Sequence, residues 1–152
     1  MATDRPNPYG SFNYMVEFGE VPGGGGGTIQ AGFSDVSGLG NEVNYSEYRT
    51  GTDAENTVRK IPNTYKIDEV TLKRGLIGSK DIFEWITAVR NGHYQPRSVT
   101  IVMLDEARND VLHLVLTNAQ PKKWVGPTLA AKGGTEVAME ELHLVAERID
   151  FV

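Results

Sequence analysis

The chain of 152 residues has the length of one ordinary domain, and a chain of this size can bury a core without a metal or a disulfide. It contains no cysteine, which excludes disulfides, thiolate metal sites and cysteine nucleophiles. Its net charge of −5 has the wrong sign for holding nucleic-acid phosphates, and its apolar runs are too short to cross a bilayer. We expect one domain over residues 1–152 with no membrane insertion.

The first third of the sequence predicts short strands joined by turns. Residues 12–18 alternate aromatic or branched side chains with polar ones, a pattern typical of a half-buried strand. Five consecutive glycines at 23–27 predict a flexible loop, after which residues 28–33 form the second strand of a hairpin. Residues 37–40 predict a turn, and residues 42–49 predict another strand.

Residues 50–64 follow neither the helical nor the strand period. A structureless connection of this length is unusual inside a compact domain and is usually functional or disordered. We therefore expect an irregular arm or loop here. Periodic structure resumes as a strand over residues 67–74, with Val70 and Leu72 on one face.

Residues 79–91 predict a helix. Ser79 is a suitable N-cap, and Asp81 places a carboxylate in the first turn, where it favours the helix dipole. Asn91 and Gly92 then end the segment. The apolar side chains follow the i, i+3, i+4, i+7 spacing of one helix face: Ile82, Trp85, Ile86 and Val89.

The last third predicts a hairpin followed by a long strand. Residues 99–104 and 111–117 are apolar and rich in branched side chains, and a polar turn separates them, so parts of both strands should be covered on both faces. Residues 122–127 have the turn chemistry of a connection. Residues 136–152 favour helix by propensity, but their apolar side chains also fall at alternate positions, as in a strand. We interpret them as one long strand.

The search for chemistry finds no catalytic, cofactor-binding or metal-ligating residues. His113 and His143 lie in predicted strands, where a hydrogen-bonded structural role is the simplest interpretation. The glycine run lacks the Gly-Lys-Ser/Thr ending of a phosphate loop. The carboxylates of residues 136–150 could perform glycoside hydrolysis in principle, but a solvated acidic face explains them more simply.

Charge varies along the chain. Residues 1–64 carry 8 acidic and 4 basic side chains, residues 65–104 carry 4 and 6, and residues 105–152 carry 8 and 5. Copies of such a chain can attract one another head to tail, the geometry that builds rings and filaments.

A series of short motifs runs in order along nearly the whole chain. They are NPYGSFNYMVE at 7–17, AGFSDVSGL at 31–39, EYR at 47–49, RKIP at 59–62, VTLKRG at 70–75, FEW at 83–85, VMLDEA at 102–107, NAQPKKWVGP at 118–127 and EVAMEEL at 136–142. Together they resemble the inner tail tube proteins of contractile phage tails and phage tail-like contractile injection systems.

This resemblance implies a mainly β fold with one α-helix: an antiparallel β-sandwich or barrel of the tail tube type with an extended arm. It implies a structural subunit rather than an enzyme, forming hexameric rings that stack into a hollow conduit for DNA or effector cargo inside a contractile sheath. The implied partners are the chain itself, the sheath, baseplate or initiator tube proteins and a terminator cap. Assembly contacts are expected at Arg49, Arg59, Lys60 and Pro62.

The resemblance also implies assembly in the bacterial cytoplasm and a place in a virion tail or an injection particle. The five-glycine insert and the sequence Pro-Asn-Thr-Tyr at 62–65 depart from the family pattern. Two alternatives stay open: a type VI secretion-like hexameric tube protein, and a small β-barrel binding or hydrolytic protein. The phage or injection-system origin, main or initiator position, cargo and lumen-lining face also stay open.

Overall fold

The computed structural model describes residues 6–19, 29–52, 54–55, 57–76, 81–94, 96–133 and 137–152. The predicted glycine loop and the Ser79 cap lie outside these residues. Within them the chain forms strands and the helix α1 (Asp81–Arg90). The strands in chain order are β1 (Tyr14–Phe18), β2 (Ile29–Ala31), β3 (Asp35–Ser37), β4 (Asn41–Tyr48), β5 (Arg59–Ile67), β6 (Val70–Gly75), β7 (Arg97–Leu104), β8 (Asp110–Val125), β9 (Met139–Val145) and β10 (Arg148–Phe151).

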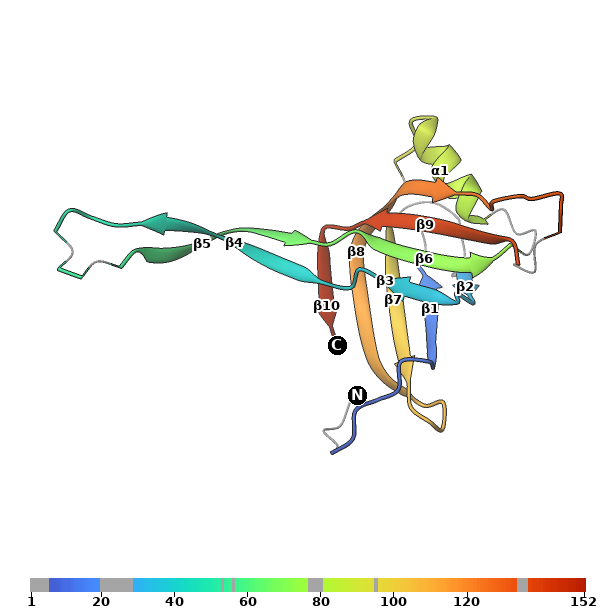
Figure 1. Ribbon diagram of the computed structural model, residues 1–152, viewed down its shortest axis with the longest axis horizontal. Helices are drawn as coiled ribbons and strands as arrows, with labels where there is room; N and C mark the ends of the chain where they lie inside the picture. Colours follow the sequence, from blue (N-terminus) through green and yellow to red (C-terminus); the bar gives the residue numbers. More distant parts are fainter. Residues whose placement is uncertain are drawn as a thin grey trace.

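The strands form two layers joined through β8. The hydrogen-bonded order is β2-β1-β7-β8-β9-β6-β3, with β10 also paired to β8, and every pair is antiparallel. In Figure 1, β1, β7 and β10 run across the direction of β6 and β9. This arrangement confirms the predicted antiparallel β-sandwich with one helix.

Strand β8 passes from one layer to the other. Its first half pairs with β7 and β10, and its second half, from Gln120 onward, pairs with β9. Between the halves lies Asn118, whose backbone φ of 52° is left-handed, a conformation that asparagine tolerates better than most residues. Because the backbone turns there without losing its ladder, residues 122–125 continue the strand, and their prediction as a connection is wrong.

The C-terminal segment is two strands rather than the single long strand predicted. β9 pairs with β6 and β8, whereas β10 pairs with an earlier part of β8. Ala146 and Glu147 separate them, and the backbone N–H of Glu147 donates to the Thr117 carbonyl at 3.0 Å. The chain must break here because β8 itself changes layer at this level, so one straight strand cannot follow both halves.

The core lies between the two layers and beneath α1. Every second residue of β6 and β9 is buried, and the cross-strand pairs Leu72–Leu142 and Val70–Leu144 share the inner face. Leu116 of β8 meets them and is completely buried. Burying each such side chain contributes about 1.5–3 kcal/mol to folding.

The helix closes one side of this core and confirms the sequence prediction. Ile82 and Trp85 are buried, and the Trp85 ring meets the Phe18 ring edge to face at a centroid distance of 5.9 Å. The helix ends at Arg90, followed by Gly92 with a positive φ of 88° that suits a helix C-terminus.

Candidate assembly interface

A long hairpin, residues 41–67, projects from the rest of the molecule. We call it the arm, and we call the described residues outside 38–69 the body. The arm consists of β4 and β5, paired with each other and extending well beyond the body in Figure 1. Residues 59–64, predicted as irregular, belong to β5, so that part of the prediction for 50–64 is wrong. Periodicity is weak there because both faces of the hairpin are exposed, and no buried face imposes alternation.

A bulge in β5 interrupts the register of the arm. Val43 lies opposite Tyr65 but Tyr45 lies opposite Pro62, so β5 has one extra residue between these pairs. The amide side chains at the bulge bond across the hairpin: Asn44 donates to Thr64 at 2.9 Å, and Asn63 donates to Ser46 at 2.8 Å. These bonds hold the bulge in place and keep the outer part of the arm in a single register.

Four large side chains share one side of the arm. By cross-strand register and strand parity, these are Val43 and Tyr45 of β4 with Pro62 and Tyr65 of β5. All four are exposed, and Tyr45 retains 58% of its accessible surface. We call this row the apolar arm face. A two-stranded hairpin with no third strand and no second layer is at best marginally stable in water. This row is therefore suited to packing against another molecule.

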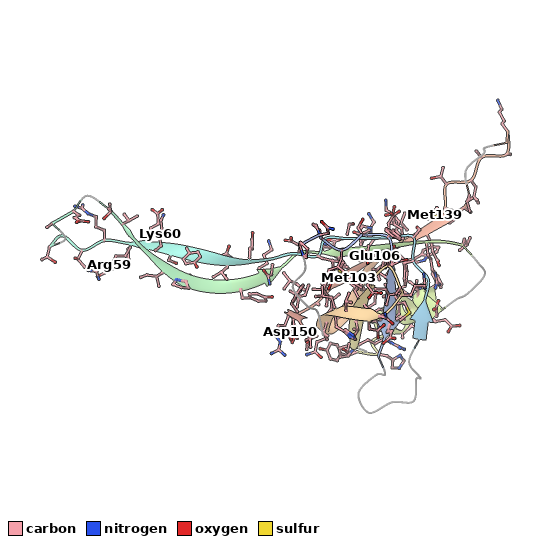
Figure 2. The ribbon with its side chains drawn as sticks, turned by 90° about the horizontal axis from the view of Figure 1, so that it is seen from below. Arg59, Lys60, Met103, Glu106, Met139 and Asp150 are labelled. Carbon is pink, nitrogen blue, oxygen red and sulfur yellow. The ribbon has the colours of Figure 1, made fainter. Side chains whose placement is uncertain are left out.

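The predicted assembly residues are brought together on the outer part of this arm. Arg59, Lys60 and Pro62 lie on β5, and Arg49 directly follows β4, with its guanidinium donating to the Glu55 carbonyl at 3.4 Å. Figure 2 shows Arg59 and Lys60 far from the body.

An ion pair continues the apolar arm face toward the tip. Lys60 bonds to Glu47, which lies directly opposite it in register. The hydrogen bond from Lys60, and then its positive charge, lower the pKa of Glu47. Both side chains are largely exposed, so this pair organises the arm more than it stabilises the fold.

The body contains a buried polar cluster that sequence reasoning missed. Arg74 donates to Glu140 at 2.5 Å and to Asp81 at 2.6 Å, and Trp124 donates to the second oxygen of Glu140 at 3.1 Å. The side chains of Arg74 and Glu140 are each only 4% exposed. The cluster joins α1 to β6, β8 and β9. The interpretation of the C-terminal carboxylates as a solvated acidic face is therefore wrong for Glu140.

The alternation of buried positions along β6 and β9 could have revealed this cluster. Arg74 continues the buried row of Val70 and Leu72, and Glu140 begins the buried row of Leu142 and Leu144. Burial alone lowers the pKa of the Arg74 guanidinium, but the hydrogen bonds and charges of Asp81 and Glu140 outweigh it and the net pKa is raised. The cation therefore remains charged in the core, where its partners compensate for lost hydration.

The histidine expectation is confirmed for His143. Its ring lies near Thr71, Glu69 and Glu141, all within hydrogen-bonding or ion-pair distance. Within the described part of the chain, no three His, Asp or Glu side chains gather as a metal site. The described helix is also not long and apolar enough to cross a membrane.

Comparisons with known proteins agree with this architecture. A structure of the anti-feeding prophage baseplate is similar with a TM-score of 0.84 and 21% identity, covering 97% of each chain. A sheath-tube complex of an extracellular contractile injection system, PVC, is similar with a TM-score of 0.81 and 23% identity, covering 97% of this chain and 93% of that one. At these identities the likeness concerns the fold.

A more distant structural likeness is to a type six secretion system protein, with a TM-score of 0.53 and 9% identity over 93% of this chain and 83% of that one. No curated protein matches the sequence significantly. The model of one protein family, described as T4-like virus tail tube protein gp19, matches residues 10–150. This match spans nearly the whole chain, which therefore belongs to the T4-like virus tail tube protein gp19 family.

Proposed function

We propose that this chain is the structural subunit of an inner tube, with residues 1–152 acting as one tube domain. Subunits form hexameric rings, and the rings stack into a hollow conduit inside a contractile sheath. The observation that carries this proposal is the arm: it is exposed on both faces yet bears the apolar row of Val43, Tyr45, Pro62 and Tyr65. Such a row becomes favourable only when a neighbouring subunit covers it.

The sheet edges support ring closure. The strand order of one layer places β2 at one side and β10 at the other. Among the described residues, each is a short strand with one neighbour in the hydrogen-bonded order. Pairing unlike edges of adjacent copies is a head-to-tail contact, which closes into a ring when the rotation allows. Closure also removes the edges that would otherwise favour aggregation.

Arg49, Arg59, Lys60 and Pro62 are the proposed assembly contacts. They are exposed on an arm that reaches beyond its own body (Figures 1 and 2). The basic side chains among them would face acidic surface on a neighbour, and residues 105–152 have an excess of acidic side chains. Electrostatic complementarity of this kind sets orientation and register more than affinity.

Further proposed partners are a sheath, a baseplate or initiator tube protein and a terminator cap. The named structural relatives were determined within a baseplate and a sheath-tube complex, which supports this context. DNA or effector protein is the proposed cargo, and the bacterial cytoplasm is the proposed place of assembly. We propose a structural rather than an enzymatic role. Among the carboxylates of residues 136–150, Glu140 accepts hydrogen bonds from Arg74 and Trp124.

A type VI secretion-like tube remains the second candidate. The fold likeness to a type six secretion system protein favours it, but the TM-score of 0.53 is well below the 0.84 of the anti-feeding prophage structure. Co-expression with a contractile tail sheath separates the two. We expect this chain to enter sheathed tubes, whereas a tube protein of the other class would not assemble with that sheath.

The test of the tube itself is electron microscopy of the purified chain at increasing concentration. We expect six-fold rings and stacked tubes. The double variant Arg59→Ala/Lys60→Ala should require a higher concentration to assemble while retaining the wild-type melting temperature. Lys132→Ala removes an exposed charge from the body and serves as the matched control. A wild-type chain that stays monomeric at high concentration, even with its sheath, would contradict the proposal.

A further inference from the structure

The arm joins the body through a narrow root. The chain enters and leaves the arm through residues 38–40 and 68–69, where the backbone N–H of Asp68 donates to the Gly40 carbonyl at 3.0 Å. Beside them, Ile67 at the end of β5 packs against the core, and β5 contacts β10. Gly38 has a φ of 82°, and a Cβ at this position would lie 2.0 Å from the Glu69 carbonyl oxygen. The two backbone segments of the root therefore touch at Gly38. The stiffness of the root then depends on the packing of Ile67 and on polar side chains that reach the body.

Glu69 supplies such a connection. It lies in the root, two residues after β5 ends, and its carboxylate contacts two different strands of the body. Lys122 of β8 donates to Oε2 at 2.6 Å, and Nδ1 of His143 on β9 lies 2.7 Å from Oε1. We call these three residues the root clamp. Because each carboxylate oxygen has its own cationic or N–H partner on a different strand, the clamp restrains rotation of the root as well as its separation from the body.

His143 has charged groups on several sides. Its Nε2 lies 3.3 Å from Glu141 on the same strand, and Thr71 of β6 approaches Nδ1 at 3.3 Å. Lys73 in turn pairs with Glu141 at 3.3 Å, and Lys123 of β8 lies opposite His143 in register. Only a doubly protonated ring can donate from both nitrogens to Glu69 and Glu141 together, whereas a neutral ring has a single N–H.

We propose that the root clamp of Glu69, Lys122 and His143 sets the direction in which the arm leaves the body, and that the clamp loosens when His143 loses a proton. Glu69 acts here as a positioning residue. A neutral ring that keeps Nδ1–H still donates to the ionised Glu69 carboxylate, but the attraction between two opposite charges is lost. Loss of the charge on Lys122 or Glu69 loosens the clamp more than deprotonation of His143 does, because it removes the Lys122–Glu69 ion pair altogether.

This inference extends beyond ring assembly, since it concerns the unassembled subunit. Exposed ion pairs contribute little to folding stability, so a stability measurement would show only a small effect of the clamp. Its consequence is geometric: small rotations at the root become large displacements at the arm tip. The direction of the arm in a free subunit therefore decides how readily its apolar face meets a neighbour.

The cysteine-free sequence makes a direct measurement possible. Ala54→Cys near the arm tip and Ala107→Cys in the β7–β8 turn are both exposed and accept spin labels. Pulsed electron paramagnetic resonance on the monomer fraction then gives the distribution of arm-to-body distances. We expect a narrower distribution at about pH 5 than at about pH 8.

Substitutions in the root clamp test whether a broader distance distribution results from loss of its contacts. Glu69→Gln and Lys122→Met should widen the distribution by about twofold or more at both pH values, as expected for a hinge without its tether. His143→Gln should remove the pH dependence. Glu47→Gln, which breaks an ion pair within the arm and leaves the root intact, should reproduce the wild-type distribution.

Equal widths for the wild type and Glu69→Gln would overturn the clamp, and pH-dependent broadening that persists in His143→Gln would overturn the role of the histidine. Because the labels report on monomers, neither result bears on tube formation. Conversely, a subunit that never forms tubes could still show the clamp.

Discussion

The body and the arm are built from the same kind of antiparallel strand pairing but differ in what covers them. In β6 and β9, alternate side chains enter a core closed by α1, whereas every described side chain of β4 is exposed. The body can therefore fold on its own buried surface. The arm has its ladder and its cross-strand bonds but no second layer, and it must obtain that layer from another subunit.

This difference separates folding from assembly within one chain. Changes in the body should act on the free energy of unfolding, and changes in the outer arm should act on subunit association. Four predictions test how cleanly the two regions divide, beginning with the largest expected effect.

Arg74→Met should destabilise the body most. It leaves Glu140 buried without its cation, and breaking one partner of a buried ion pair costs about 3–5 kcal/mol. Chemical denaturation of the unassembled chain measures this loss. The double variant Arg74→Met/Glu140→Leu should recover much of the stability, because no uncompensated charge remains in the core. A double variant as unstable as the single one would show that the ion pair itself is required.

Leu142→Ala should destabilise the body by nearly as much as Arg74→Met. Leu142 is completely buried opposite Leu72, and truncating a core leucine costs about 2–5 kcal/mol through lost burial and the cavity left behind. The midpoint of denaturant unfolding should fall without loss of tube-forming ability at low temperature. Leu129→Ala, at an exposed position of the body, is the control and should leave the midpoint in place. Equal midpoints for both variants would contradict the assigned core.

Acid should lower the stability of the protein by a smaller amount than either core substitution, through carboxyl groups near the arm root. Hydrogen bonds from Lys122 to Glu69 and from Lys73 to Glu141, with contributions from His143, lower the pKa of both carboxyl groups from their ordinary value of 4.5. Their stabilising effect is therefore complete above pH 4.5 and is lost as the pH falls through the lowered values. Melting temperatures measured down this range should decline less steeply in Glu69→Gln/Glu141→Gln than in the wild type. If the melting temperatures of the variant and the wild type fall in parallel with pH, these two carboxyl groups do not cause the loss of stability in acid.

Tyr45→Ser should have the smallest effect on folding. The side chain is exposed on the apolar arm face, and substitutions at such sites usually change stability by no more than about 0.5 kcal/mol. Sedimentation velocity should nevertheless show association shifted to higher concentration. Tyr94→Ser, an exposed tyrosine on the body, is the matched control for loss of surface aromatic area. If both variants associate like the wild type, the apolar arm face is not an interface.

Much of the body could be predicted because a buried face requires apolar residues at regular spacing in the sequence. Alternation in residues 12–18 and 67–74 reflects the inner faces of β1 and β6, and the spacing of Ile82 and Trp85 reflects the face of α1 against the core. The motif series also led to the tail tube family. Arg59, Lys60 and Pro62 lie on the arm, in a strand rather than in the irregular segment that the sequence predicts. Their role as assembly contacts stays a prediction.

The remaining features depend on pairing between distant segments, which no local pattern specifies. By itself, the sequence determined the helix and several strands through local periodicity. It determined the family, and with it the expected fold class, through the order of its motifs. Only the tertiary structure decided that Asn118 carries β8 from one layer to the other, that Arg74 meets Glu140, and that Glu69 meets Lys122 and His143. Each of these contacts joins strands far apart in the chain, and its free energy exists only once the layers have packed together.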